Sequence, residues 1–271
     1  MHGRIYIGTS GWNYDSWKDD FYAGVPRKSW LEYYASRLRA LEVDGTFYRT
    51  MRPSVFESWV KRTPPDFRFA IKGHRYITHI KRLEPPAQSI RLQRENSSAL
   101  GIKLAAVLWQ LPPNMYKEVP RLERFAAALD SWRETRHVIE FRHKSWFDDE
   151  TAAVMTRERL ANCLSDASKW PLWDAVTTDL VFVRLHGHAE TYVSNYEHAE
   201  LERWAGRVRG WLRERRDVHV YFDNDAHGHA PWNALKMADM IGAAAPIAAS
   251  RAIARSGEAR ARRRKPDQSR A

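Results

Sequence analysis

The chain has 271 residues, of which 44% are apolar and 12 are tryptophan, enough to bury a large core. The single cysteine, Cys163, excludes an intramolecular disulfide and fits a reducing compartment. The longest weakly polar stretch, 238–250, is too short to span a bilayer. We therefore expect a soluble, cytoplasmic protein with no membrane partner.

The net charge of +11 is spread unevenly. Residues 251–271 hold eight Lys/Arg and two Asp/Glu, so they carry +6 of the total and leave +5 for the rest. This end lacks apolar periodicity, which predicts a disordered basic tail over 246–271. Such a tail can bind nucleic acid through counterion release or simply keep a protein soluble, and it has no aromatic residue to stack on bases.

Short apolar and β-branched runs alternate with amphipathic stretches such as 29–39, 53–62 and 197–215. Alternating strands and helices imply a parallel sheet. Eight such units over residues 1–245 predict an α/β fold, a single TIM-type (β/α)8 barrel. The strands are expected at 4–8, 40–44, 67–72, 104–110, 137–142, 161–166, 181–186 and 218–224.

An open, doubly wound sheet is the competing architecture. Proteins of that class often bind nucleotides through G-x-G-x-x-G or G-x-x-x-x-G-K-[ST] loops. The sequence contains neither motif, and the short run Gly8-Thr-Ser-Gly11 is too brief to count as one. The barrel is therefore the preferred prediction.

Polar residues stand at or just after the end of almost every predicted strand. In a (β/α)8 barrel the carboxyl ends of the strands meet at one mouth, where functional groups collect. Each residue alone has an ordinary structural explanation, but their convergence predicts an enzymatic or binding site. The residues singled out are Trp12, Glu42, Lys72, Gln110, Glu140, Arg142, Trp146, Asp166, Arg184, His186 and Asp225.

Seven motifs together resemble the domain-of-unknown-function family 72, also called YecE-like. The resemblance runs from about residue 5 to residue 241 and implies a TIM-barrel-like fold without supplying a reaction. The family more often has asparagine at the positions of Asp44 and Asp223, so we expect neither carboxylate to be indispensable. The motifs are Ile7-Gly-Thr-Ser-Gly-Trp12, Glu42-Val-Asp-Gly-Thr-Phe-Tyr48, Phe69-Ala-Ile-Lys72, Gln110-Leu-Pro-Pro113, Glu140-Phe-Arg-His-Lys-Ser-Trp146, Arg184-Leu-His-Gly187 and Phe222-Asp-Asn-Asp225.

Side-chain chemistry suggests a role for each group at this mouth. Glu140 is the preferred base, His186 the proton carrier, and Glu42 and Asp166 further acids or bases. Three cations that face one mouth suit a phosphate or carboxylate, because guanidinium groups bind such anions bidentately. The expected anion clamp consists of Lys72, Arg142 and Arg184, with Trp12, Gln110, Trp146 and Asp225 as further substrate-binding residues.

Two alternatives to these roles stay open. Buried charges are usually paired, so Glu140 with Arg142, and Asp166 with Arg184, can be structural ion pairs. A divalent metal on Glu140, Asp166 and His186 is the weaker possibility, because no H-x-H, H-E-x-x-H or cysteine cluster supports it. No cofactor is otherwise indicated.

The favoured hypothesis is an enzyme, a hydrolase or isomerase, that performs general acid–base chemistry on a small polar substrate bearing phosphate or carboxylate. A glycoside hydrolase would use Glu42 with Glu140, and Trp12 and Trp146 would stack on the sugar. A nucleic-acid-binding protein or metal-dependent phosphodiesterase, assisted by the basic tail, is the second hypothesis. A non-catalytic small-molecule-binding protein is the third.

Overall fold

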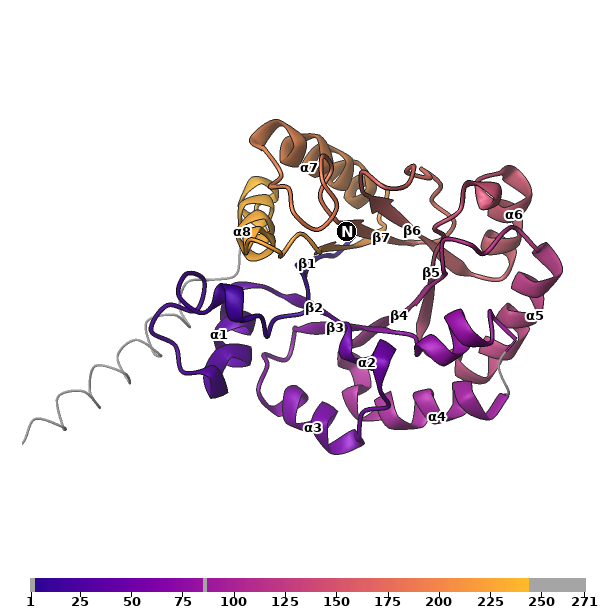
Figure 1. Ribbon diagram of the computed structural model, residues 1–271, viewed down its shortest axis with the longest axis horizontal. Coiled ribbons are helices and arrows are strands. Elements are labelled where there is room, and N and C mark those ends of the chain that lie inside the picture. The colour runs from indigo at the N-terminus through magenta and orange to yellow at the C-terminus, as the bar shows by residue number, and fades with distance from the viewer. Residues whose placement is uncertain (1–2, 85–86, 244–271) are drawn as a thin grey trace, which may run out of the picture.

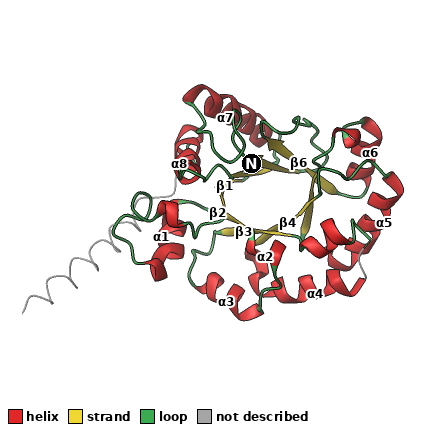
Figure 2. Ribbon diagram, in the orientation of Figure 1, coloured by secondary structure: helices red, strands yellow, loops and turns green. Residues whose placement is uncertain are grey.

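The structure, a computed structural model, describes residues 3–84 and 87–243. Within these ranges eight parallel strands close into one barrel in chain order, with β8 paired to β1. Helices surround the ring of strands (Figures 1 and 2), which confirms the predicted (β/α)8 architecture. The strands are β1 (Ile5–Ser10), β2 (Ala40–Val43), β3 (Arg68–Lys72), β4 (Leu104–Gln110), β5 (Arg136–Glu140), β6 (Leu160–Asp166), β7 (Leu180–Leu185) and β8 (Asp217–Phe222).

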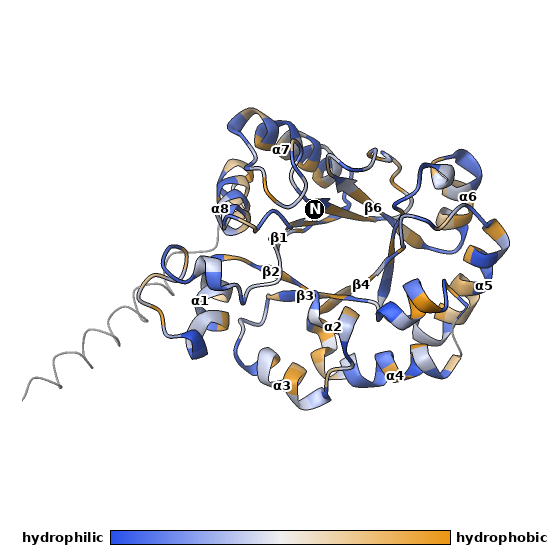
Figure 3. Ribbon diagram, in the orientation of Figure 1, coloured by the Kyte–Doolittle hydropathy of each residue, from blue (hydrophilic) through white to orange (hydrophobic). Residues whose placement is uncertain are grey.

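The helices lie outside the barrel, and hydrophilic and hydrophobic residues alternate along them (Figure 3), as expected for helices with one buried face. A π-helix (Tyr76–Ile80) follows β3, and short 3-10 helices cover 15–17, 27–29, 98–103, 130–132 and 144–146. The α-helices are α1 (Trp30–Arg37), α2 (Gly45–Tyr48), α3 (Pro53–Lys61), α4 (Ala87–Ser97), α5 (Val119–Leu129), α6 (Asp149–Arg157), α7 (His198–Arg213) and α8 (His229–Ile241).

Most strand boundaries differ slightly from the sequence-based ones. β5 ends at Glu140, β7 at Leu185 and β8 at Phe222, so Arg142, His186 and Asp223 lie in the loops that follow. β1 instead continues to Ser10, which pairs with Glu42 of β2 in the parallel register. Charged side chains thus reach the mouth both from strand ends and from the first loop residues.

Alternation along the strands divides the core into two apolar clusters. One set of side chains packs outward against the helices, and Leu41 and Phe69 belong to it. The other set fills the inside of the barrel and includes Ala70, Phe182 and Tyr221. We call this second set the inner plug; its members are Ala40, Ala70, Ala106, Leu108, Val138, Ala161, Cys163, Leu180, Phe182 and Tyr221.

Charged residues flank the inner plug at both ends of the barrel, because the alternation continues past it. Two positions beyond Ala40 and Ala70 towards the carboxyl ends come Glu42 and Lys72. Two positions before Ala70 and Val138, at the start of β3 and β5, come Arg68 and Arg136. The barrel is therefore an apolar plug between a polar C-terminal mouth and a polar N-terminal face.

Two expectations concern the chain as a whole. None of the helices within 3–84 and 87–243 is long and apolar enough to cross a membrane. The disordered tail predicted from residue 246 lies outside the described residues.

Candidate functional site at the carboxyl ends of the strands

Arg184, on β7, is the centre of the C-terminal mouth and is 1% exposed. Its Nε and Nη2 donate to the two carboxylate oxygens of Glu42 at 3.0 and 2.7 Å, the bidentate geometry of strong Arg–carboxylate pairs. Nη1 donates to Glu140 at 3.0 Å, and Nη2 also to Asp223 at 2.8 Å. Arg184 thus joins carboxylates from β2, β5 and the loop after β8.

Glu140 is fully buried at the end of β5. Arg142 lies 2.6 Å from its Oε1, and the Ser165 hydroxyl donates to the same oxygen at 2.8 Å. Burial alone favours the neutral acid, but Arg142 and Arg184 hold the pKa of Glu140 well below its usual range. The Arg142 guanidinium also stacks over the Trp170 ring at 3.6 Å. The predicted Glu140–Arg142 pair is therefore present.

Lys72 and Asp44 form a second ion pair beside Glu42, with 3.1 Å between Nζ and Oδ1. The Ser10 hydroxyl lies 2.6 Å from Asp44 and 2.7 Å from Glu42, and its single proton can serve one carboxylate at a time. Burial raises the pKa of Glu42, although Arg184 opposes that rise. The pKa of Glu42 is thus raised even though the side chain is paired with Arg184.

His186 lies between two carboxylates just after β7 and is fully buried. Its Nδ1 is 2.9 Å from Asp223, and its Nε2 is 3.3 Å from Glu140. In the neutral form Nε2 can accept a hydrogen bond from Arg184, 3.2 Å away. In the protonated form the same nitrogen faces Glu140 with a proton to donate. His186 therefore bridges Glu140 and Asp223.

Asp223 and Asp225 have pKa values displaced in opposite directions. Burial opposes ionisation of both, but Arg184 and His186 lower the pKa of Asp223 to about 2. Burial, reinforced by Asp223 and Asp44, raises the pKa of Asp225 to about 8. The Oδ1 atom of Asp225 is buried without a hydrogen-bond partner among the described residues. At neutral pH Asp223 is therefore ionised while Asp225 keeps its proton.

Tyr14 closes the same corner of the mouth. Its hydroxyl donates to the Ser10 carbonyl at 2.8 Å, and Asp225 and burial raise its pKa above the usual range. Gly11 lies beneath this ring with φ of 81°, and a β-carbon there would collide with the Tyr14 hydroxyl. The glycine thus permits both the left-handed turn and the close approach of the ring.

Carboxylates outnumber the lysine and arginine side chains of the mouth. Three cations, Lys72, Arg142 and Arg184, are each paired with carboxylates of the site. The five carboxylates are Glu42, Asp44, Glu140, Asp223 and Asp225, of which Asp225 keeps its proton at neutral pH.

Asp166 does not join this network, which corrects two predictions. Its oxygens accept from Tyr196 at 3.0 Å and Trp204 at 3.3 Å, and His188 lies 3.1 Å away. The expected Asp166–Arg184 pair is therefore wrong, because Asp166 faces α7. The proposed metal ligands Glu140, Asp166 and His186 are not assembled either: within the described ranges no three His, Cys, Asp or Glu side chains form a group that could hold a metal ion.

The aromatic predictions also change. Trp146 is fully buried, stacks on Phe141 at 4.8 Å and donates its Nε1 proton to the Met115 carbonyl at 2.8 Å. It is a core residue and cannot stack on a substrate, so that prediction is wrong. Trp12 is partly buried edge-on against Trp59 at 5.1 Å. Gln110 ends β4, half-buried beside Glu140 in the register.

Several residues of the network escaped the sequence reasoning. Asp44 and Asp223 were discounted because the family often has asparagine there, yet each pairs with a cation of the mouth. Ser165 stands two positions after Cys163 of the inner plug, so strict alternation on β6 could have identified it. Trp170 lies in an irregular segment and donates to Ser165 at 2.9 Å. No sequence pattern marks it.

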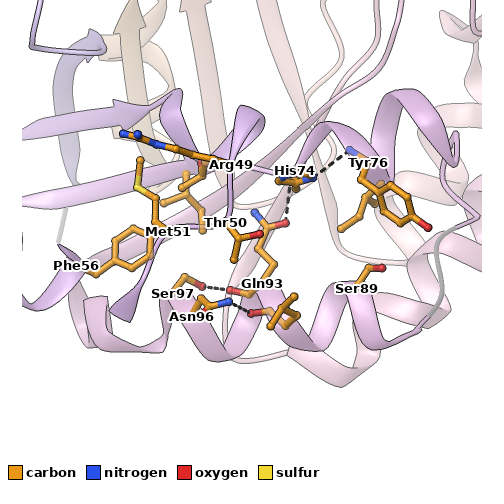
Figure 4. Close-up of a pocket in the computed structure, with 14 residues that line it drawn as sticks. Arg49, Thr50, Met51, Phe56, His74, Tyr76, Ser89, Gln93, Asn96 and Ser97 are labelled. Carbon is orange, nitrogen blue, oxygen red and sulfur yellow. Dashed lines mark hydrogen bonds between the residues drawn. The ribbon is translucent and has the colours of Figure 1, made fainter. Parts of the chain in front are cut away.

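A cavity of about 150 Å³ lies behind Lys72, among α2, α3, α4 and the loop after β3 (Figure 4). Its walls are mainly apolar, and Met51 and Phe56 contribute to them. Gln93 accepts from the His74 backbone N–H at 3.0 Å and donates to the Lys72 carbonyl at 3.0 Å. Gln93, in the wall of this cavity, thus supports the backbone of the mouth from outside.

Comparison with known proteins agrees with this architecture. The chain is 26% identical to the UPF0759 protein YunF of Bacillus subtilis over 88% of this chain and 94% of that protein. It is 28% identical to the UPF0759 protein YecE of Escherichia coli over 53% of this chain and 50% of that protein. The crystal structure of a DUF72 family protein (TM1631) from Thermotoga maritima superposes with a TM-score of 0.80 at 26% identity, covering 88% of this chain and 99% of that one. Because the family model "Protein of unknown function DUF72" matches residues 6–256, this chain belongs to the DUF72 family.

Proposed function

We propose that the protein is an enzyme, of the hydrolase or isomerase type, that performs general acid–base chemistry on a small polar substrate at the C-terminal mouth. One observation carries this proposal: the buried His186 ring lies 2.9 Å from Asp223 and 3.3 Å from Glu140, in a mouth where the pKa of Asp223 is lowered to about 2 and that of Asp225 is raised to about 8. Two carboxyl groups with separated pKa values are the usual way in which one site holds an acid and a base at neutral pH.

Each group has a distinct role in the proposed mechanism. Asp225, half-buried and protonated, donates a proton to the substrate. His186, held between Glu140 and Asp223, accepts a proton and returns it. Arg184 is a positioning residue, because its described partners Glu42, Glu140, Asp223 and Ser10 surround it and it is 1% exposed.

The pairing of the cations favours an uncharged, hydroxyl-bearing substrate over a phosphate or carboxylate. The three cations expected to clamp an anion already face carboxylates of the protein. An anion would have to displace those carboxylates from their partners and would then lie beside them. Hydroxyl groups, in contrast, can donate to ionised carboxylates and accept from protonated Asp225. We therefore propose a sugar or polyol without a charged group.

Solvent exchange tests the proposal before the substrate is known. Sugars, polyols and their phosphorylated counterparts are incubated with the protein in D2O and followed by NMR, which detects both C–H exchange and hydrolysis products. Asp225→Asn should abolish the reaction because it removes the proton donor. Asp239→Asn, on the exposed side of α8, is the matched control and should keep full activity.

Three results would contradict the proposal. If phosphorylated compounds react faster than their neutral parents, Lys72, Arg142 and Arg184 bind an anion as first expected. If activity survives Asp225→Asn, Asp225 is not the proton donor. Ligands that raise the melting temperature but undergo neither exchange nor cleavage would indicate a binding protein without catalysis.

A further inference from the structure

The N-terminal face of the barrel is also rich in charge, and arginine dominates it. All eight strands begin at this face because they are parallel. Arg4 precedes β1, Arg68 begins β3 and Arg136 begins β5. These three arginines line one cavity of about 290 Å³ together with Tyr6, Asp217 and His219. We call this cavity the basal cavity.

A second cavity, of about 340 Å³, adjoins the basal cavity where β5, β6 and β7 begin. Arg136 lines both cavities, and Arg133 and Arg159 line the second. Together the two cavities are lined by five arginines and two aspartates, Asp179 and Asp217. Asp130 also pairs with Arg133 at 2.7 Å, so these eight side chains carry an excess of two positive charges.

The two aspartates leave part of this positive charge available. Asp217 is shared between Arg4 at 3.2 Å and Arg136 at 3.6 Å, and Asp179 lies 2.9 Å from Arg136. Arg68 donates to the carbonyl oxygens of Pro65 and Phe67 at 3.1 Å, which leaves its charge uncompensated. Arg4 is 68% exposed and Arg136 39% exposed, so solvent ligands can reach both guanidinium groups.

Two further arginines at this end of the barrel have a backbone conformation that is costly for a residue with a side chain. Arg159 and Arg215 have φ angles of 56° and 64°, in the left-handed region that favours glycine. They stand in the short connections that lead into β6 and β8. Glycine would fit both turns without strain. The chain nevertheless carries a long cationic side chain at each turn, at a cost in stability.

We propose that this face binds the phosphodiester backbone of a single-stranded nucleic acid. A chain of phosphates can occupy both cavities in succession, with Arg136 between them, whereas one isolated phosphate would use only part of the surface. This face is the end of the barrel opposite to the proposed catalytic mouth.

The test uses the full-length chain and a fluorescein-labelled single-stranded DNA of about 16 nucleotides, a typical length for such sites. Binding is measured by anisotropy over a series of salt concentrations. The double variant Arg68→Ala/Arg159→Ala removes two arginines that make no ion pair with a described residue. The control Arg91→Ala/Arg203→Ala removes two exposed arginines from α4 and α7, so the net charge and the tail are the same in both variants.

We expect the first variant to bind about tenfold more weakly, a loss of about 1.4 kcal/mol, and the control to change by less than about twofold, because only the first variant loses two phosphate contacts. The slope of log Kd against log salt should fall by about 1.4 in the first variant only. Equal weakening in both variants, or in neither, would overturn the proposal. Displacement of the DNA by inorganic tripolyphosphate at equal phosphate concentration would also overturn it, in favour of a small polyphosphate ligand.

Discussion

Arg184 and Glu42 are joined by two parallel hydrogen bonds of 3.0 and 2.7 Å at the centre of the barrel mouth, and both side chains are buried. The same guanidinium also pairs with Glu140 and Asp223. One cation is therefore shared by three carboxylates of the mouth, so the site depends on it for stability as well as for geometry.

Arg184→Met should accordingly be strongly destabilising. It leaves Glu42, Glu140 and Asp223 without their shared cation, and unpaired buried charges cost about 3–5 kcal/mol. Chemical denaturation at pH 7 measures the loss in the free energy of unfolding. Arg203→Met, on the exposed surface of α7, should change it by less than about 0.5 kcal/mol. A loss below about 1 kcal/mol for Arg184→Met would mean that water replaces the guanidinium.

Asp225 should make the protein less stable as the pH rises. Its folded pKa of about 8 lies above the unfolded value near 3.8, so the folded state binds the proton more tightly. The loss in the free energy of unfolding that Asp225 causes is absent below about pH 4 and reaches its full size at about pH 8. Asp225→Asn should therefore unfold at a higher denaturant concentration than the wild type at pH 9. The difference should shrink towards pH 4; an equal difference at both pH values would contradict the raised pKa.

Trp146→Ala should act on stability rather than on ligand binding. The side chain is fully buried against Phe141, and truncation of such residues costs about 3–5 kcal/mol. Trp146→Phe keeps most of the volume but loses the hydrogen bond to Met115, so its cost should be smaller. Thermal unfolding of both variants checks this order. If Trp146→Ala is stable but binds substrate poorly, Trp146 stacks on the substrate as first predicted.

Arg159→Gly should stabilise the protein while weakening its binding to nucleic acid. Glycine relieves a left-handed backbone conformation that costs about 1–2 kcal/mol in other residues. The same change removes one cation from the N-terminal face. Denaturation and DNA anisotropy on the same sample separate the two effects. A loss of stability would show that the Arg159 side chain has a structural partner.

The sequence predicted the barrel well because its signal is periodic. Alternation on β3 and β5 places Arg68, Ala70 and Lys72, or Arg136, Val138 and Glu140, on the same side of a strand, and the structure places them inside the barrel. Closure of eight parallel strands then brings their carboxyl ends together, so most of the mouth followed from the strand ends.

The pairing within the mouth was harder to predict, because it depends on contacts between strands far apart in the sequence. Arg184 selects Glu42 and Asp223 rather than Asp166, which instead receives hydrogen bonds from Tyr196 and Trp204. The direction of a side chain in a loop or at a strand end is not periodic, and no local pattern specifies it. For the same reason, Trp146 could not be assigned to the core from its place in a motif.

The inner plug has a kinetic consequence. Its alanine, valine and phenylalanine side chains fill the barrel from wall to wall and leave no passage along the axis. A molecule that reaches the C-terminal mouth must leave through the opening by which it entered. If the mouth is catalytic, product and substrate therefore compete for one entrance, and product inhibition of the enzyme should be competitive.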